Sequence, residues 1–390
     1  MLHVLYLVHD LCDPATARRV AMLQAGGAHV TLAGFRRGAL PTFDGIAPID
    51  LGMTGDRAFA QRLIAVGKAA IMLGARLKGL MKPDIVVARN LEMLALANRV
   101  HAFFGANVPI VYECLDIHRL LLDEGAVGKA MRGAERFLGR NAALLLTSSP
   151  AFVREYFEAR GQSHASVMLL ENKVLELSRG AGQPMRAASP PAEGEAWRIG
   201  WFGALRCARS LALLAAFTRA TQGRFEVVLR GRPAHVEFDD FDGFVAAEPH
   251  MRFEGPYRNP QDLPAIYGEV HFSWAIDFFE AGMNSDWLLP NRLYEGCRFG
   301  AVPLAMQGTE TGRFLAGHGI GLLLDRPEAE PLTALLEDMT AGRYAALSEA
   351  VAVHKPETWV CDAAECRALV ERMKGVAASA WARTPVEAAA

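Results

Sequence analysis

Residues 288–305 read LLPNRLYEGCRFGAVPLA, a stretch in which a short helix leads through a glycine into an apolar strand. A proline and an asparagine stand where the helix begins, and Gly300 suits the turn at its end. Two charged residues, Arg292 and Glu295, lie in this helix just before a strand apolar enough to be buried. A helix that runs directly into a buried strand is typical of α/β folds.

The same alternation of apolar runs and helical patterns extends along the chain. Continuous apolar strands that alternate with helices indicate parallel sheets covered by helices on both faces. A chain of 390 residues is too long for one ordinary core, and residues 178–195 are rich in Pro, Gly, Ala and Ser, as in a linker. The sequence therefore predicts an α/β protein with two tandem Rossmann-like, doubly wound domains that face each other across a cleft. The predicted parts are residues 1–177, the linker 178–195, residues 196–370, and a C-terminal helix or tail at 371–390.

The composition excludes several classes of protein. A net charge of −2 creates no field that would favour nucleic acid. The six cysteines form no C-x-x-C pair, which favours buried thiols over disulfides or a zinc site. The first strand is not followed by G-x-G-x-x-G, and the chain has no G-x-x-x-x-G-K-[ST] motif, which counts against a dehydrogenase or a P-loop protein. No signal peptide or 18-residue apolar stretch is present, so we expect a cytoplasmic protein.

Five segments of the second half, in this order, resemble a known family. They are RIGWFGALRCARSLALLAAF (198–217), FEGPYRNPQDLPAIYGEVHFSW (253–274), LPNRLYEGCRFGAVPLA (289–305), TGRFLAGHGIGLLLD (311–325) and HKPETWVCDAAE (354–365). This region resembles the nucleotide-sugar-binding domain of GT-B glycosyltransferases, especially family 4 and its bacterial exopolysaccharide relatives of the succinoglycan type. The first half agrees more loosely. The resemblance implies transfer of a sugar from a nucleoside-diphosphate donor to an acceptor, with no metal and no further cofactor. The acceptor it suggests is a lipid-linked saccharide in exopolysaccharide or cell-surface glycan synthesis.

The helix of the opening stretch has the chemistry to bind such a donor. An ionised carboxylate can accept hydrogen bonds from both vicinal hydroxyls of a ribose, which is the role we predict for Glu295. Arg292 offers a fork of donors for phosphate oxygens, and by resemblance it stands where the family usually has Lys. The helix N-terminus, with Asn291 and Leu293, would add N–H groups and partial positive charge. The alternative is a capped surface helix with an i,i+3 Arg–Glu pair.

A second group of predicted donor-binding residues follows the strand 197–203. By resemblance Arg209 aligns with the family's diphosphate-binding Lys, and Arg206 is an additional candidate close to it. Gly203 would allow phosphates or another backbone to come close. The alternative for both arginines is ordinary solvated surface.

The sequence departs from the family in the segment before Glu295. Family 4 typically carries Glu-x7-Glu, but Trp287 occupies the first position, with Asp286 and Glu280 as substitutes. A polar turn is an equal alternative for this segment, and the departure leaves retention or inversion at the sugar open. FDDFD (238–242) contains Asp-x-Asp, but in a GT-B-like domain we predict no metal site there.

The N-terminal half offers candidates for acid–base catalysis. YECLDIH (112–118) ends a predicted strand, and in an inverting enzyme Asp116 would be the general base for the acceptor hydroxyl. Glu113 and His118 are the reserve candidates, and Leu115 stands where the family often has His. The alternative for Asp116 is a helix cap or a salt bridge in a loop.

The end of the first predicted strand carries three more polar residues. His9 and Asp10 are expected at the same edge of the sheet, while Asp13 is predicted to cap the next helix because Pro14 suits its first position.

Residues 57–82 are basic and contain no acid. A basic amphipathic helix can rest on anionic lipid, which would suit an acceptor that hangs from a polyprenyl lipid at the inner face of the plasma membrane. The alternative is a core helix with a solvated basic edge. The basic residues of this segment are Arg57, Arg62, Lys68, Arg76, Lys78 and Lys82.

Two other functions are compatible with these patterns. One is a nucleotide-sugar 2-epimerase of the same architecture, which would need no acceptor. The other is a catalytically inactive scaffold that binds the nucleotide within a glycan-assembly complex, an interpretation suggested by the missing first Glu.

Overall fold

The computed structural model describes residues 1–55, 59–105, 107–163, 165–178 and 187–383, with 59–63 and 383 described by backbone alone. The chain forms two compact units. The first unit comprises Met1–Glu171 and the segment that begins at Asp362, and the second comprises Asn172–Cys361. This division differs from the predicted boundaries at 177, 196 and 370. The first unit ends at Glu171, and the last helix belongs to the first unit and not to the second domain and the tail. Part of the predicted linker, residues 179–186, lies outside the described residues.

The sheet of the first unit contains seven parallel strands in the order β3-β2-β1-β4-β5-β6-β7. All seven residues of β1 are buried, as expected for a central strand covered on both faces. Its strands are β1 (Leu2–Val8), β2 (Ala28–Arg36), β3 (Ile49–Met53), β4 (Ile85–Arg89), β5 (Ile110–Cys114), β6 (Ala142–Thr147) and β7 (Ser166–Leu169). The apolar runs at residues 3–9, 28–35, 83–89, 108–116, 142–149 and 166–174 predict all of these except β3, a short strand at the edge of the sheet.

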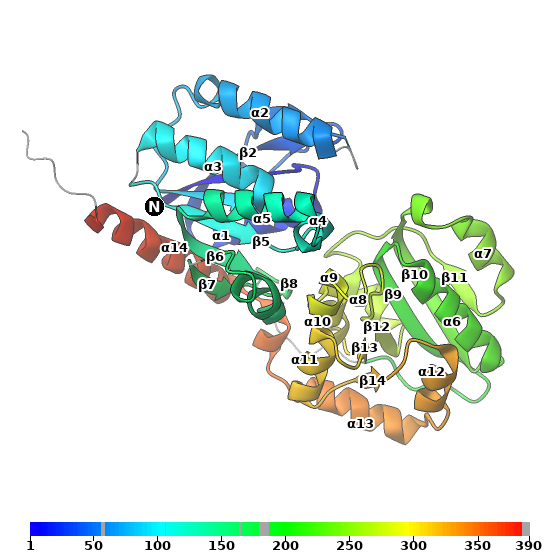
Figure 1. Cartoon of the computed structure of the whole chain (residues 1–390). Helices are drawn as coiled ribbons and strands as arrows, with labels where there is room; N and C mark the ends of the chain where they lie inside the picture. The colour runs from blue at the N-terminus through cyan, green and yellow to red at the C-terminus, as the bar shows by residue number, and fades with distance from the viewer. Residues whose placement is uncertain (56–58, 106, 164, 179–186, 384–390) are drawn as a thin grey trace, which may run out of the picture. The chain divides into compact units, whose positions relative to one another are not determined.

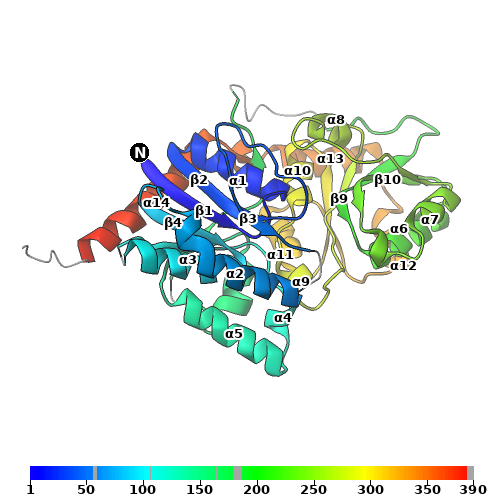
Figure 2. The ribbon, with the colours of Figure 1, turned by 90° about the horizontal axis from the view of Figure 1, so that it is seen from above.

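Helices cover both faces of this sheet. The helix α1 lies beside α14, whereas α2, α3 and α5 cover the opposite face (Figure 1, Figure 2). The contact between α1 and α14 is tight, because a Cβ on Gly26 would lie 2.3 Å from the carbonyl oxygen of Cys366. The helices are α1 (Pro14–Ala25), α2 (Phe59–Arg76), α3 (Asn90–Phe104), α4 (Arg119–Leu122), α5 (Ala126–Gly139), the π-helix η1 (Phe152–Glu158) and α14 (Ala363–Arg383).

The second unit repeats the strand order of the first. Its six strands are parallel and follow the order β11-β10-β9-β12-β13-β14, which in chain order within the unit is 3-2-1-4-5-6. This order is that of the doubly wound dinucleotide-binding fold, in which ligands bind outside the carboxyl ends of the strands. The strands are β9 (Trp197–Leu205), β10 (Phe225–Pro233), β11 (Met251–Phe253), β12 (Phe272–Trp274), β13 (Val302–Met306) and β14 (Leu322–Leu324).

The helices of the second unit enclose an aromatic core that includes Trp201, Phe217 and Trp274. The helix α10 packs on β12 and β13 and so holds its N-terminus near the carboxyl end of β12. The helices are α6 (Ala208–Ala220), α7 (Phe241–Ala247), α8 (Leu263–Gly268), α9 (Asn284–Trp287), α10 (Asn291–Arg298), α11 (Glu310–His318), α12 (Ala329–Leu336) and α13 (Ala341–Ala352). The 3-10 turns are η2 (His235–Glu237) and η3 (Pro356–Thr358). A small parallel pair, β8 (Val174–Leu175) with β15 (Val360–Cys361), lies where the chain enters and leaves the unit.

Within the part of the chain that the structure describes, no helix combines the length and the hydropathy needed to cross a bilayer.

Candidate functional site

Gly203 lies inside β9, not in a loop after it. The strand continues to Leu205 and pairs Gly203 with Gly231 of β10. Both glycines have positive φ, 110° and 131°, and a Cβ on Gly231 would lie 1.9 Å from the carbonyl oxygen of Gly203. A Cβ on Gly203 itself would come near the Tyr257 hydroxyl alone, at 3.9 Å, among the described atoms. The close approach of two strands therefore accounts for Gly231, while Gly203 faces open space beside Tyr257.

Arg292 is largely buried and only partly satisfied by protein groups. Its side chain is 12% exposed, its Nη2 donates to the Ile276 carbonyl at 2.8 Å, and the same nitrogen lies 3.7 Å from the Asp277 carboxylate. Its Nε is buried and has no hydrogen-bond partner among the residues that the structure describes. The helix that carries it is buried from Leu293 to Arg298, so the alternative of a surface helix is wrong. The guanidinium is anchored, and its buried Nε is left without a protein partner among the described residues.

Glu295 is held by two neutral donors. Its Oε1 accepts from Asn259 Nδ2 at 2.9 Å, and its Oε2 accepts from the Tyr267 hydroxyl at 3.1 Å. Burial of a carboxylate is costly unless hydrogen bonds compensate, and these two bonds also fix its orientation. A carboxylate has about four acceptor positions, which is compatible with a pair of hydroxyls.

Asp277 follows β12 and lies between two of the predicted arginines. Its side chain is 8% exposed, with Arg206 Nη2 at 3.5 Å and Arg292 Nη2 at 3.7 Å. Burial alone would raise the pKa of Asp277, but the guanidiniums of Arg292 and Arg206 hold that pKa below its ordinary value. Sequence reasoning missed this residue, although an acid directly after a buried strand was a signal that could have found it.

The loop after Asp277 also contacts the arginines that follow β9. The guanidinium of Arg206 lies 4.7 Å from the Phe279 ring centre, and that of Arg209 lies 5.0 Å from the Phe278 ring centre. Arg206 is partly exposed and Arg209, in the first turn of α6, is exposed. Together with Arg292 these contacts gather three predicted cations around one short loop.

Tyr257 connects this group of cations to Glu295. Burial and the nearby Glu295 carboxylate raise the pKa of Tyr257, and Arg292 opposes this shift. The structure thus brings Gly203, Arg206, Arg209, Arg292 and Glu295 together at one edge of the second sheet.

The remaining two residues predicted at the start of α10 take different positions. Asn291 is exposed at the first position of the helix. Leu293 is fully buried in a cluster with Leu289 and Tyr294, and its N–H donates to the Pro290 carbonyl at 3.0 Å. The Leu293 side chain therefore packs α10 against the core and contributes no polar group to the site.

The acidic segment before α10 forms a local turn. Asp286 accepts from the Gly282 N–H at 3.1 Å, and the Glu280 N–H donates to the Ser285 hydroxyl at 2.9 Å. The residues NSDW form the single turn α9. In the predicted metal-free segment, Asp240 caps α7 through the Gly243 N–H at 2.9 Å. Within the described ranges no group of three or more His, Cys, Asp or Glu side chains could hold a metal ion.

Two candidates for acid–base catalysis lie together after β5 in the first unit. Asp116 is exposed in the turn that follows the strand. His118 is exposed too, and its Nδ1 accepts from the Leu120 N–H at 3.3 Å as the cap of α4. This bond assigns the proton of a neutral imidazole to Nε2. In this geometry the Nε2 can donate to a substrate but cannot accept a proton from it.

Glu113, the reserve base, is fully buried. It accepts from Arg19 Nε at 2.5 Å and from the Tyr6 hydroxyl at 2.5 Å, and Arg89 lies 3.9 Å away. Burial would raise the pKa of Glu113, but Arg19 and Arg89 hold it below its usual value. The carboxylate is a structural counter-ion and is not accessible to an acceptor.

The polar residues after β1 are also engaged with their own unit. His9 Nδ1 lies 3.3 Å from the side-chain nitrogen of Asn90, and Asp10 pairs with Arg37 at 3.3 Å. Asp13 caps α1 by accepting from the Ala15 N–H at 2.9 Å, which confirms the predicted cap.

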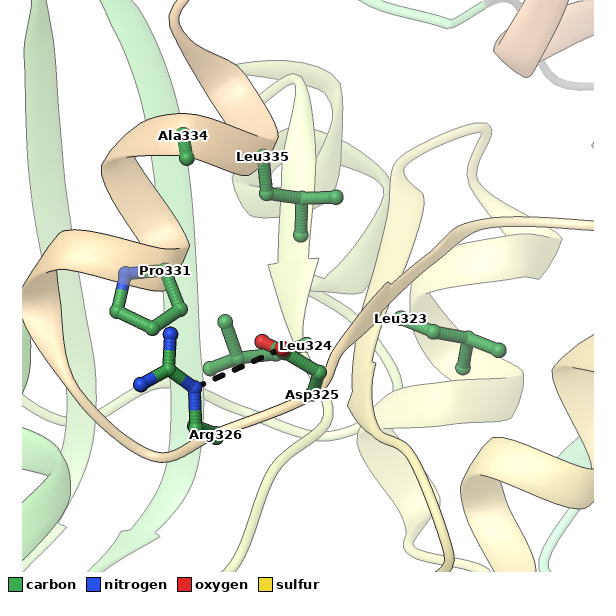
Figure 3. Close-up of a pocket in the computed structure, with 7 residues that line it drawn as sticks. All are labelled: Leu323, Leu324, Asp325, Arg326, Pro331, Ala334 and Leu335. Atoms are coloured by element: carbon green, nitrogen blue, oxygen red, sulfur yellow. Dashed lines mark ion pairs between the residues drawn. The ribbon is translucent and has the colours of Figure 1, made fainter.

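Two shallow cavities lie away from the residues predicted to bind the donor. One, of about 250 Å³, lies beside β14 and α12, where Figure 3 shows the Arg326 side chain between Pro331 and Asp325. The Arg326–Asp325 pair is 3.7 Å long and both side chains are more than 60% exposed, so it is an ordinary surface pair. The other, of about 330 Å³, lies between β3 and α2. None of the predicted site residues of the second unit lines either cavity.

Comparison with known proteins places the chain in a family. No protein-family model matches the sequence. The chain is 57% identical to the succinoglycan biosynthesis protein ExoL of Rhizobium meliloti (strain 1021) over 395 residues, which cover 100% of this chain and 98% of that protein. It is similar in fold to Anabaena Alr3699/HepE in complex with UDP and glucose, with a TM-score of 0.66, 14% identity and coverage of 96% of this chain and 100% of that one. It is also similar to the lipopolysaccharide outer core galactosyltransferase WaaB, with a TM-score of 0.61, 14% identity and coverage of 97% and 99%. The predicted fold class is confirmed: the chain has the GT-B fold and belongs to the family of the succinoglycan biosynthesis protein ExoL.

Proposed function

We propose that the chain is a glycosyltransferase that moves a sugar from a nucleoside-diphosphate donor to a saccharide acceptor during exopolysaccharide synthesis. Membership of the ExoL family supports the pathway, and the likeness to a protein that binds UDP and glucose supports the class of donor. The observation that carries the proposal is the pairing, on α10, of the anchored Arg292 guanidinium with the oriented Glu295 carboxylate.

The donor would be bound by groups of opposite charge at its two ends. Glu295 accepts from the ribose hydroxyls, while Arg292, Arg206 and Arg209 face the diphosphate. When the sugar leaves, negative charge grows on the diphosphate, and guanidiniums already fixed in place stabilise that charge without reorganisation. Most of the rate gain would come from this electrostatic term and from positioning of the two substrates.

The acceptor hydroxyl must lose its proton during transfer. Asp116 is exposed at the carboxyl end of β5 and would accept this proton in an inverting reaction. Replacement of Asp116 by Asn is then expected to lower kcat at least 100-fold with little effect on donor affinity.

A donor panel tests the function. Calorimetry with UDP-, GDP- and ADP-sugars is expected to find one sugar nucleotide that binds tightly. Glu295→Ala is expected to lower the affinity for this donor tenfold or more through loss of the ribose contact. Binding with turnover only after addition of a lipid-linked saccharide supports the transferase. Release of the nucleotide and a rearranged sugar without acceptor would favour the epimerase, and binding without any turnover would favour the scaffold.

The acceptor we propose is a lipid-linked saccharide, and α2 is the surface we propose for contact with anionic membrane. One face of α2 packs in the core through Val66, Ala69 and Leu73. The opposite face exposes apolar side chains, with Ile64 59%, Ile71 83% and Met72 51% exposed, alongside the exposed Lys68. The alternative of a core helix explains the first face and leaves the second unexplained. Of the predicted basic residues, Arg57 lies outside the described residues, as does the side chain of Arg62.

Vesicle flotation tests this surface. The protein is expected to float with vesicles that contain phosphatidylglycerol, and Ile71→Asp is expected to reduce the bound fraction several-fold. Val236→Asp, at a residue 72% exposed in the second unit, is the matched control. Equal flotation of all three proteins, or none for the parent, would remove α2 from the proposal.

A further inference from the structure

Asp277 is a buried acid that the proposed function has not used. It lies in the loop between β12 and α9, 8% exposed, with Arg206 on one side and Arg292 on the other. Its neighbours in sequence, Ile276 and Phe279, are themselves contacts of those arginines, since the Ile276 carbonyl accepts from Arg292 and the Phe279 ring lies under Arg206. One short segment therefore holds both guanidiniums.

The Asp277 carboxylate is held by groups of its own segment. Its Oδ1 accepts from the Phe279 N–H at 2.8 Å and from the Ser285 hydroxyl at 3.3 Å. The two guanidiniums approach it at 3.5 and 3.7 Å, which are ion-pair distances and leave donors on the forks unused. The Arg292 Nε is one such donor, buried and without a partner among the described residues.

This geometry distinguishes two roles that Asp277 could have: an acid that orients the arginines, or an acid that occupies the position of the ligand. An acid that merely occupied the ligand position in the empty protein would lie at the open end of the site and take the donors of both arginines. Asp277 is instead more buried than either arginine, is tied to its own loop, and leaves donors unused. A fixed carboxylate behind a guanidinium orients it, in the way that hydrogen-bonded partners orient ligating side chains.

We propose that Asp277 is a positioning residue that holds Arg206 and Arg292 in the orientation required to bind the donor diphosphate. The inference rests on the proposed function. Without the carboxylate, the partly exposed Arg206 loses its counter-ion and is free to turn into solvent, whereas Arg292 keeps its bond to the Ile276 carbonyl. Asp277 thereby determines recognition of phosphate and has no effect on recognition of the nucleoside.

The test compares UDP with uridine in titration calorimetry, or the corresponding pair for the base found in the donor panel. Asp277→Asn keeps the shape and removes the charge, and it is expected to weaken UDP at least tenfold while uridine binds as before. Asp325→Asn breaks the exposed Arg326–Asp325 pair of Figure 3 and is the matched control, with both ligands unchanged. UDP affinity that is unchanged or increased in Asp277→Asn would overturn the proposal.

A double-mutant cycle gives a second, independent readout. If Asp277 acts through Arg206, then Asp277→Asn in an Arg206→Ala background is expected to cost less than half of its effect in the parent. Fully additive losses would contradict the proposal. Should Asp277→Asn fail to fold, Ser285→Ala loosens the same carboxylate and is expected to weaken UDP two- to fivefold, with no change counting against the inference. A parent protein that binds no nucleotide would refute the proposed function itself, whatever the variants do.

Discussion

The sheets of the two units share the strand order 3-2-1-4-5-6, to which the first unit adds a seventh strand, but charged residues are arranged differently at their carboxyl edges. In the first unit, Arg19 and Arg89 are both less than 9% exposed and are compensated by Glu113, with Asp13 as a second partner of Arg89. In the second unit, Asp277 faces two arginines, and Glu295 is held by neutral donors. Compensated charges hold a structure together, whereas guanidiniums with unused donors are available to an anion. Two units with a common strand order can therefore differ in whether their arginines are available to an anion, so strand order alone does not identify the anion-binding unit.

The largest effect is expected from the compensated network of the first unit. Glu113→Gln removes the charge that offsets Arg19 and Arg89 inside the protein. Breaking a buried ion pair on one side costs about 3–5 kcal/mol, so we expect a loss of this size in the free energy of unfolding, measured with urea. Nucleotide affinity of the folded fraction is expected to stay the same. Glu226→Gln, in a partly exposed pair with Arg252, is the control and should cost less than about 1 kcal/mol.

The second unit should respond in the opposite way to loss of a cation. Arg292→Ala is expected to lower kcat by roughly 100- to 1,000-fold, as for other fixed groups that stabilise transition-state charge, and to change stability much less than Glu113→Gln does. Steady-state kinetics with a parallel urea titration would measure both. Arg313→Ala, which removes a half-exposed partner of Glu310, should leave kcat unaltered. A stability loss in Arg292→Ala as large as that of Glu113→Gln would erase the contrast between the units.

Acid is expected to affect the two units in different pH ranges. Burial lowers the pKa of His271 to about 4 from 6.5, and the bond to the Ser189 carbonyl offsets only part of this shift. The Nδ1 of His271 accepts from the Arg198 N–H at 2.9 Å, and its Nε2 faces the Ser189 carbonyl at 2.9 Å. Between these two pH values His271 is protonated in the unfolded chain but not in the folded chain. Stability therefore falls as the pH drops from 6.5 towards 4. At pH 5 the loss is about 2 kcal/mol.

The contribution of Glu113 is also lost on acidification, but at lower pH than that of His271. Its pKa is lowered in the folded state, so its stabilisation is complete above the ordinary carboxylate range and is lost only as the pH falls below it. Urea titrations at pH 7 and pH 5 should show that His271→Asn flattens the change between these two values and that Glu113→Gln does not. A parent protein equally stable at both pH values would refute the assignment to His271.

The smallest effect is expected at His118. Loss of its cap on α4 should cost at most about 1 kcal/mol, and kcat should fall less than tenfold, because the imidazole has no free acceptor in this geometry. The measurement compares kcat of His118→Ala with kcat of Asp116→Asn at equal substrate saturation. A larger fall in kcat for His118→Ala than for the Asp116 variant would reverse the roles proposed for them.

Local sequence was sufficient to predict most of the architecture and to name most residues of the candidate site. Buried parallel strands are continuous apolar runs, so β1, β4 and β9 could be recognised directly, and Asp13 with Pro14 marked the start of α1. The helix with Arg292 and Glu295 carried the resemblance because its spacing is local. The strand β3 was missed since IDLGM, at a sheet edge and with Gly52 at positive φ, has no apolar run.

Contacts between distant parts of the chain could not be read in this way. Arg206 meets Asp277 and Arg292 although a long stretch of chain separates it from them. The position of Asp277 after a buried strand marks it as a candidate, but the sequence does not show that two arginines face it. The same holds for α14, which the chain order assigns to the second unit and packing on α1 assigns to the first. The physical reason is that periodicity records which face of an element is buried, whereas the partner that buries it, and the charges that face each other there, depend on how the elements pack.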